Sequence, residues 1–90
     1  ESSIRYLAAD LGPKNIRANA ISAGPMRTLA ARGLKDFAVM YDGMKEKAPL
    51  KRNITTTEVG DTATFLCSEL ASGITGEILH VDAGYHAVGV

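Results

Sequence analysis

Residues 24–28, Gly-Pro-Met-Arg-Thr, combine a sharp turn with a cation and a hydroxyl, directly after a short run of small and apolar residues. Glycine lets a ligand approach the backbone closely and proline fixes φ, so the bend is stiff. If a helix begins near Leu29, the amides of residues 26–28, the Thr28 hydroxyl and the Arg27 guanidinium can bind an anion such as phosphate. The alternative is that Gly-Pro simply ends a strand and Thr28 caps a helix.

Two elements precede this turn. Apolar residues spaced i, i+3, i+4 and i+7 predict a helix, and these are Ile4, Leu7, Ala8 and Leu11. The helix starts at Glu1 without a cap, so we expect the chain to enter it partway along. It should stop at Gly12-Pro13, because glycine can take a positive φ and proline cannot continue the hydrogen-bond ladder. Residues 16–23 then predict a strand that is covered on both faces.

After the turn, residues 29–47 have a helical pattern that Gly33 and Gly43 interrupt. Each glycine costs about 1 kcal/mol relative to alanine inside a helix, so we expect short, mobile helices here. Thr55 followed by Glu58 has the spacing of a capping box and predicts the start of a firmer helix. Its apolar face comprises Val59, Ala63, Leu66, Cys67 and Leu70. Residues 71–73 should close this helix, and residues 77–81 predict a second strand that ends at 82–84.

The order helix, strand, helical insertion, helix, strand predicts an α/β fold with a parallel sheet. Two strands leave edges and apolar faces uncovered, so we expect the chain to be the C-terminal part of a larger, Rossmann-like doubly wound domain. Ligands of such sheets bind beyond the carboxyl ends of the strands, which is where residues 24–28 follow the first strand.

Composition limits the classes of partner. Ten basic residues balance ten acidic residues, so no overall charge favours nucleic acid or an anionic membrane. Cys67 is the single cysteine, which excludes an internal disulfide; on an apolar helix face it should be inert. No apolar run approaches the roughly 20 residues of a membrane span and the start resembles no signal peptide, so a cytoplasmic protein is expected. We find no metal-ligand spacing; His80 is expected to be packed and hydrogen-bonded in its strand, and His86 indicates little.

A family resemblance spans essentially all ninety residues. The motifs that carry it are residues 19–28, 35–37, 48–50, 58–60, 65–68, 73–77 and 80–82. In order and spacing they resemble the C-terminal third of bacterial enoyl-acyl-carrier-protein reductases, which are divergent short-chain dehydrogenases. Ordinary members of that superfamily tend to carry Pro-Gly at the turn, whereas residues 22–25 read Ser-Ala-Gly-Pro, as in the enoyl reductases.

The resemblance implies roles for individual residues. The backbone of Pro25 and Met26 would hold the nicotinamide carboxamide of NADH or NADPH. Arg27 and Thr28 would lie at the pyrophosphate, with Leu29 and Ala30 continuing along the cofactor. Residues 29–48 would form a helical lid over the acyl chain, lined by Ala30, Leu34, Phe37 and Met40. From the residues alone, core positions of an amphipathic helix explain Phe37 and Met40 better, and it is the resemblance that favours the lid.

The implied reaction is hydride transfer from the reduced nicotinamide to the β-carbon of a trans-2-enoyl thioester, in type II fatty-acid synthesis. A tyrosine stabilises the resulting enolate and a lysine seven residues later helps to hold the ribose. That pair is absent from this chain: Pro13 follows Tyr6 at this distance, Ala48 follows Tyr41, and the sequence ends after Tyr85. We therefore expect no catalytic residue in these ninety and no catalysis by them alone.

Partners and rival functions follow from the same resemblance. Acyl carrier protein would bring the substrate and could dock at Lys35, although Ala38 and Val39 occupy positions where the family can place cations. Family members are commonly homotetramers, and the apolar tail at 87–90 is a plausible interface element. Two other functions stay open, namely a ketoreductase of the same fold and a non-catalytic binding or assembly module.

Overall fold

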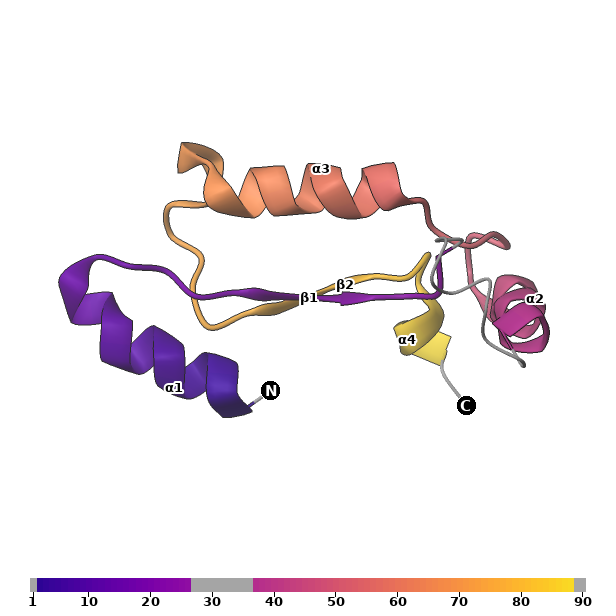
Figure 1. The fold of residues 1–90 in the computed structure, drawn as a ribbon, viewed down its shortest axis with the longest axis horizontal. Coiled ribbons are helices and arrows are strands. Elements are labelled where there is room, and N and C mark those ends of the chain that lie inside the picture. Colours follow the sequence, from indigo (N-terminus) through magenta and orange to yellow (C-terminus); the bar gives the residue numbers. More distant parts are fainter. Residues whose placement is uncertain (1, 27–36, 89–90) are drawn as a thin grey trace.

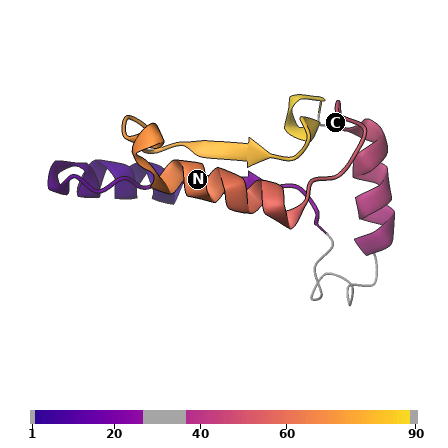
Figure 2. The same cartoon turned by 90° about the horizontal axis from the view of Figure 1, so that it is seen from above.

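The computed structural model describes residues 2–26 and 37–88 of the ninety. In chain order the elements are α1 (Ser2–Leu11), the 3-10 turn η1 (Gly12–Lys14), β1 (Ala20–Ala23), α2 (Phe37–Lys47), α3 (Thr56–Cys67), the 3-10 turn η3 (Glu69–Ala71), β2 (Ile78–Val81) and α4 (Tyr85–Val88). Helices α1 and α3 lie on opposite sides of the strand pair (Figure 1). Helices α2 and α4 lie at the end where the strands finish (Figure 2). This is the three-layer arrangement of an α/β fold.

The two strands are parallel, as the sequence predicts. Their register pairs Ala20 with Ile78 and Ala23 with Val81, and they form a two-stranded sheet in the described part of the chain. Strand β1 is shorter than the expected 16–23, and the residues before it are held by a backbone hydrogen bond, from the N–H of Gly76 to the carbonyl of Ala18 over 2.8 Å, together with side-chain bonds. The N–H of Ala18 donates to the Thr75 hydroxyl over 3.0 Å. The carboxyl ends of both strands therefore meet at one edge of the sheet.

Asn19 sets the register at the start of β1. Its side-chain amide donates to the carbonyl of Ile74 over 3.0 Å, and its Oδ1 accepts the N–H of Glu77 over 3.0 Å. One side chain thus fastens the start of β1 to the residues that lead into β2.

Helix α1 ends at Leu11 as expected, but its termination differs in detail from the prediction. Gly12 and Pro13 continue in the 3-10 turn η1, and the residue with positive φ is Asn15, at 61°. Asparagine tolerates this conformation because its short polar side chain carries little steric penalty there. The prediction of a left-handed glycine at position 12 is therefore wrong.

Helix α3 begins with the predicted capping box. The Thr55 hydroxyl accepts the N–H of Glu58 over 3.2 Å, and a Glu58 carboxylate oxygen accepts the N–H of Thr55 over 2.9 Å. The apolar face is confirmed only in part. Leu66 is buried, but Cys67 is exposed and Leu70 lies beyond the helix with 82% of its surface accessible.

The other end of α3 is held by Arg17. Its guanidinium donates to the carbonyl oxygens of Leu66 and Ser68 over 2.8 and 3.4 Å, and to that of Ile74 over 3.3 Å. Carbonyl groups in the last turn of a helix lack intrahelical partners, so this cation satisfies them. Arg17 therefore links the approach to β1 with the end of α3.

Helix α2 runs without a break from Phe37 to Lys47. Gly43 lies inside it, so the expectation that this glycine interrupts the helix is wrong. None of the residues of α2 is buried, and Gly33 lies outside the described residues. No helix of the described chain is long and apolar enough to cross a bilayer.

The apolar cluster at the ends of the strands is small. Ala48, Ile54 and Ala83 are buried in it, and the side chains of Met26, Val59, Val81 and Tyr85 pack against them. These residues come from the turn after β1, the segment between α2 and α3, the first turn of α3, the end of β2, and the turn and helix α4 that follow it. The cluster consequently supports the edge of the sheet at which a site is expected.

Candidate functional site at the carboxyl ends of the strands

The turn after β1 lies directly against the turn after β2. The N–H of Gly24 donates to the carbonyl of Val81 over 2.9 Å, which extends the pairing of the strands by one residue. A Cβ atom at Gly24 would lie 3.2 Å from both Cα and Cβ of Asp82. Positive φ, which the structure records for Gly76 and Gly84, is not recorded for Gly24. This glycine is therefore needed because of close backbone approach rather than left-handed geometry.

The next two residues hold free backbone groups in a fixed place. The Met26 side chain packs against the cluster of Ala48, Ile54 and Ala83, so its backbone is anchored from one side. Neither the carbonyl of Pro25 nor the N–H and carbonyl of Met26 is hydrogen-bonded to another residue that the structure describes. A donor and acceptors side by side match a carboxamide, which carries both an NH₂ group and a carbonyl oxygen. Within the described chain, the turn therefore offers backbone groups to which a carboxamide can hydrogen-bond.

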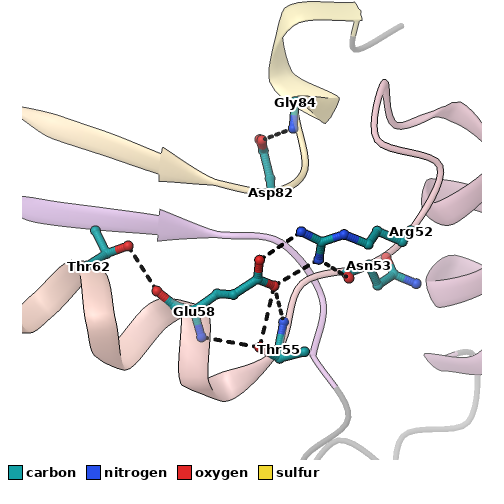
Figure 3. A network of polar contacts seen from close by, with 7 residues as sticks. All are labelled: Arg52, Asn53, Thr55, Glu58, Thr62, Asp82 and Gly84. Carbon is teal, nitrogen blue, oxygen red and sulfur yellow. Dashed lines mark hydrogen bonds and ion pairs between the residues drawn. The ribbon is translucent and has the colours of Figure 1, made fainter.

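The segment after α2 is attached to the turn after β2. The N–H of Leu50 donates to the carbonyl of Ala83 over 3.1 Å. Gly84 has φ of 89°, and a Cβ atom there would lie 2.9 Å from Cγ of Pro49. The N–H of Gly84 also donates to Oδ1 of Asp82 over 3.0 Å, as Figure 3 shows. These contacts place the base of α2 beside the strand ends.

A polar network joins α2 to the start of α3. Arg52 donates to both carboxylate oxygens of Glu58 over 2.9 and 2.8 Å (Figure 3). Asn53 donates to the carbonyl of Tyr41 in α2 over 2.7 Å. The hydrogen bond from Arg52, together with the N–H of Thr55, lowers the pKa of Glu58 to about 2. Both side chains of this ion pair are solvent-exposed, and their opposite charges balance each other. Arg52 is thus committed to Glu58 and does not supply a free cation to the site.

Helix α2 carries apolar side chains that nothing in the described chain buries. The rings of Phe37 and Tyr41 lie 5.3 Å apart at 36°, and Phe37 is half-buried. Met40 is 48% exposed and Val39 is 77% exposed. Phe37, Met40 and Tyr41 are spaced i, i+3 and i+4, so they share one face of the helix.

The predicted site residues fall into two groups. Pro25 and Met26 lie at the carboxyl edge of the sheet, and Phe37 and Met40 lie on the helix whose base is attached to that edge. The other predicted residues lie outside the described residues; these are Arg27, Thr28, Leu29, Ala30 and Leu34. The prediction of an anion site at residues 26–28 therefore stays a prediction.

The sequence analysis missed the contacts that unite this edge. Ala48, Ile54 and Ala83 are small or medium apolar residues with no chemical signal of their own. His80 is exposed instead of packed, and its ring stacks on that of His86 with the centroids 3.9 Å apart. The sequence spacing of His80, Asp82 and His86 indicates a cluster only when the conformation of the turn at 83–84 is known.

A separate groove in the described chain lies away from this edge. Its volume is about 640 Å³, and it lies between the approach to β1 and the helix α3, with Ile16, Arg17 and Leu66 among its lining residues. This is the amino end of β1, the opposite end of the strand from Gly24. The groove is consequently no part of the site at the carboxyl edge.

Comparison with known proteins gives a consistent family. The family model described as "Enoyl-(Acyl carrier protein) reductase" matches residues 1–86. An NADPH-dependent enoyl-[acyl-carrier-protein] reductase of Staphylococcus aureus is 57% identical over 88 residues, which is 98% of this chain and 34% of the relative. An NADH-dependent reductase of Bacillus subtilis is 58% identical over 86 residues, 96% of this chain and 33% of the relative.

Solved structures agree in fold. A Bacillus cereus enoyl-acyl carrier protein reductase, crystallised with NADP⁺ and indole naphthyridinone, superposes with a TM-score of 0.91 at 57% identity, over 99% of this chain and 35% of that one. An NADH-type reductase of Aquifex aeolicus gives 0.91 at 49% identity, over 99% of this chain and 34% of that one. The chain has the Rossmann-like α/β fold of these enzymes and spans about a third of their length.

Proposed function

The chain belongs to the enoyl-(acyl carrier protein) reductase family, and from this we propose that it forms the C-terminal third of an enzyme that reduces enoyl-acyl-carrier-protein thioesters. The enzyme would reduce the trans-2 double bond with NADH or NADPH, in type II fatty-acid biosynthesis. The observation that carries the proposal is the identity of 57–58% to reductases across nearly the whole chain, the turn at 24–26 included. Relatives at similar identity use NADH or NADPH, so the choice of cofactor is left open.

The turn after β1 would bind the nicotinamide. What supports this is a backbone donor and two acceptors, held by the packing of Met26 and free within the described chain. When bound, the reduced cofactor would supply the hydride. Pro25 and Met26 would orient the carboxamide and with it the reactive face of the ring, while Arg27, Thr28, Leu29 and Ala30 would contact the rest of the cofactor. Positioning of this kind accounts for much of the rate in such reactions.

The helix α2 would cover the acyl chain as the described part of a lid at 29–48. Exposed Met40 and half-buried Phe37 offer an apolar wall on one helix face, to which Ala30 and Leu34 would add. Closing such a lid would exclude water from the reacting thioester. The residues that stabilise the enolate would come from the part of the enzyme outside these ninety residues.

The reaction is tested on the full-length protein that carries this chain. Oxidation of NADH or NADPH would be followed with crotonyl and acetoacetyl thioesters as alternative substrates. The proposal predicts reduction of the crotonyl thioester only. Reduction of the acetoacetyl thioester alone would identify a ketoreductase instead, and no turnover of either would favour a binding module.

The lid is tested by truncating its apolar face. Phe37→Ala and Met40→Ala should raise KM for long enoyl chains several-fold more than for crotonyl thioesters, because only long chains would reach this surface. Val39→Ala is the matched control, since Val39 is the most exposed apolar residue of the described helix and lies off that face. An equal effect of all three variants on short and long substrates would contradict the role of α2.

Carrier docking and assembly complete the proposal. Lys35 would contact the acidic carrier protein, so Lys35→Glu should slow turnover of carrier-bound substrate and spare short thioesters. Equal slowing of both would remove this docking role. We also propose a cytoplasmic homotetramer with residues 87–90 at an interface; light scattering of the purified full-length protein would contradict the assembly if it gave the monomer mass.

A further inference from the structure

Two histidines and an aspartate meet at the end of β2. His80 lies in β2 and Asp82 directly follows this strand, so their alternate positions place both side chains on one side. The turn at 83–84 then brings back His86, in the first turn of α4. The imidazole of histidine can act both as a base and as a metal ligand at neutral pH. Two imidazole rings thus lie beside one carboxylate.

The distances among these groups are short. Nδ1 of His86 lies 3.1 Å from each carboxylate oxygen of Asp82, and Nδ1 of His80 lies 3.9 Å from Oδ2. Ligand atoms of all three residues lie within 4.8 Å of one another. Ligands of a tetrahedral zinc ion, about 2.0–2.2 Å from the metal, are separated by about 3.4 Å. The three side chains are therefore close enough to share one ion once a ring rotates to bring its nitrogen to that separation.

The surroundings of Asp82 prepare it as a ligand. Its Oδ1 accepts the N–H of Gly84 over 3.0 Å and its Oδ2 accepts the N–H of His86 over 3.1 Å, which fixes the orientation of the carboxylate. Its partial burial raises its pKa, but the hydrogen bonds from His86 and Gly84 outweigh this effect and hold the pKa below its usual value. Hydrogen bonds of this kind orient the side chains that coordinate metal ions in proteins.

The two imidazoles are open to solvent. The side chains of His80 and His86 are 36% and 48% exposed, while that of Asp82 is 10% exposed. An ion could therefore reach the histidine nitrogens and the carboxylate from the same side. Imidazole and carboxylate together suit zinc, nickel or copper rather than calcium or magnesium, which prefer oxygen alone.

We propose that His80, Asp82 and His86 form a binding site for a divalent transition-metal ion of the zinc class. The described residues supply three ligands, so one position of a tetrahedral ion is left for water. A metal lies in the plane of each imidazole that ligates it, whereas the two rings are now stacked at 10°. Binding therefore rotates one ring out of the stack.

The site would act on the structure around it. The carbonyl of Ala83, between two of the ligands, accepts the N–H of Leu50 at the base of α2. An ion bound across this turn would fasten β2 to α4 and stiffen the attachment of α2. Without an ion, Asp82 would simply accept hydrogen bonds from His86 in α4. Zinc titration and anomalous diffraction distinguish these two states.

Calorimetric titration of chelator-treated full-length protein with zinc chloride tests the site. We expect one binding event per chain in the wild type, weakened at least about tenfold in both His80→Ala and His86→Ala, since ligand-orienting contacts alone cost 10- to 100-fold. Cys67→Ser is the matched control, because Cys67 is an exposed zinc-binding side chain outside the cluster. Unchanged affinity and stoichiometry in both histidine variants, or loss in Cys67→Ser alone, would overturn the proposal.

A second measurement needs no variant to fold. Crystals of the full-length wild type, soaked in zinc chloride, would be measured on both sides of the zinc absorption edge. An anomalous peak about 2.0–2.2 Å from nitrogens of both histidines supports the site. Zinc bound only elsewhere, or no peak at these residues, refutes it. Neither readout depends on reductase activity.

Discussion

Replacing Gly24 by alanine probes the contact that brings the two strand ends together. The added Cβ atom would lie 3.2 Å from Cα and from Cβ of Asp82 and 3.8 Å from the carbonyl oxygen of Val81. Carbon atoms pack best at about 3.5–4.0 Å, so the turn or the end of β2 must move by a few tenths of an ångström. One of the atoms in the way is backbone, which cannot swing aside as the end of a flexible side chain does.

Overpacking of this kind costs about 1–3 kcal/mol. We therefore expect Gly24→Ala to lower the free energy of unfolding of the full-length protein by that amount in urea. Because the displaced turn carries the free groups of Pro25 and Met26, the Kd for NADH or NADPH, followed by cofactor fluorescence, should rise as well. Movement of these groups out of hydrogen-bonding range would cost about 1 kcal/mol or more, which is several-fold in Kd.

Gly60→Ala is the matched control. Gly60 lies inside α3 and a Cβ atom there would meet no other atom within 4 Å. The same substitution should stabilise the protein by up to about 1 kcal/mol, because alanine is the better helix former. It should leave cofactor affinity unchanged. If Gly24→Ala matched this control in both stability and Kd, the close approach of the two turns would not restrain the site, and the reasoning would fail.

Three further predictions concern the supports of this edge. Glu58→Gln should remove a contribution to stability that is complete above pH about 4.5 and is lost as the pH falls toward about 2, because the folded-state pKa is depressed to about 2; acid unfolding curves that coincide with the wild type would contradict this. Arg17→Met should cost about 1.5–3 kcal/mol in urea unfolding, since carbonyls at the end of α3 lose a charged donor, and a change below about 0.5 kcal/mol would deny the link. Gly84→Ala should lower the melting temperature by several degrees, because φ of 89° and a Cγ atom of Pro49 at 2.9 Å leave no room for Cβ; an unchanged melting temperature would show that the turn can relax.

Local sequence signals predicted local structure well. The spacing of Thr55 and Glu58 predicted a capping box whose two hydrogen bonds are both present. The alternation of elements predicted parallel strands, and the end of α1 fell at the expected residue. The cap and the helix end depend on forces that act within a few residues, and the parallel pairing follows from the order of the elements, so the pattern contains the information.

Predictions failed where distant residues decide the outcome. Gly43 does not break α2, since its cost of about 1 kcal/mol is small beside that of ending a helix between favourable turns. Strand β1 starts four residues later than expected, and the residues just before it contact a loop more than fifty residues away through the side chains of Asn19 and Thr75 and the backbone of Gly76. Leu70 is exposed because the chain leaves α3 before reaching it.

In the candidate site, too, sequence patterns predict some features, whereas contacts between distant residues decide others. The sequence predicts a ligand near residues 24–28, because the parallel sheet dictates at which edge ligands bind, and this stays a prediction. What holds the turn there could not be predicted, since Ala48, Ile54 and Ala83 carry no pattern that relates them. The cluster of His80, Asp82 and His86 was likewise hidden, because its spacing crosses a strand, a turn and a helix.

The position of the apolar cluster relates the two halves of the proposed mechanism. Met26 of the cofactor turn packs on Ala48, which is 2% exposed and comes directly after the last residue of α2. No residue of α2 itself is buried. The packing that fixes this helix is therefore concentrated at its C-terminal base, while the rest of the helix has little apolar packing to lose. A movement of α2 that admits an acyl chain would cost least if it pivoted near Ala48, because the support of Met26 would then stay intact. In this geometry the proposed lid would open without releasing the groups that are proposed to orient the nicotinamide.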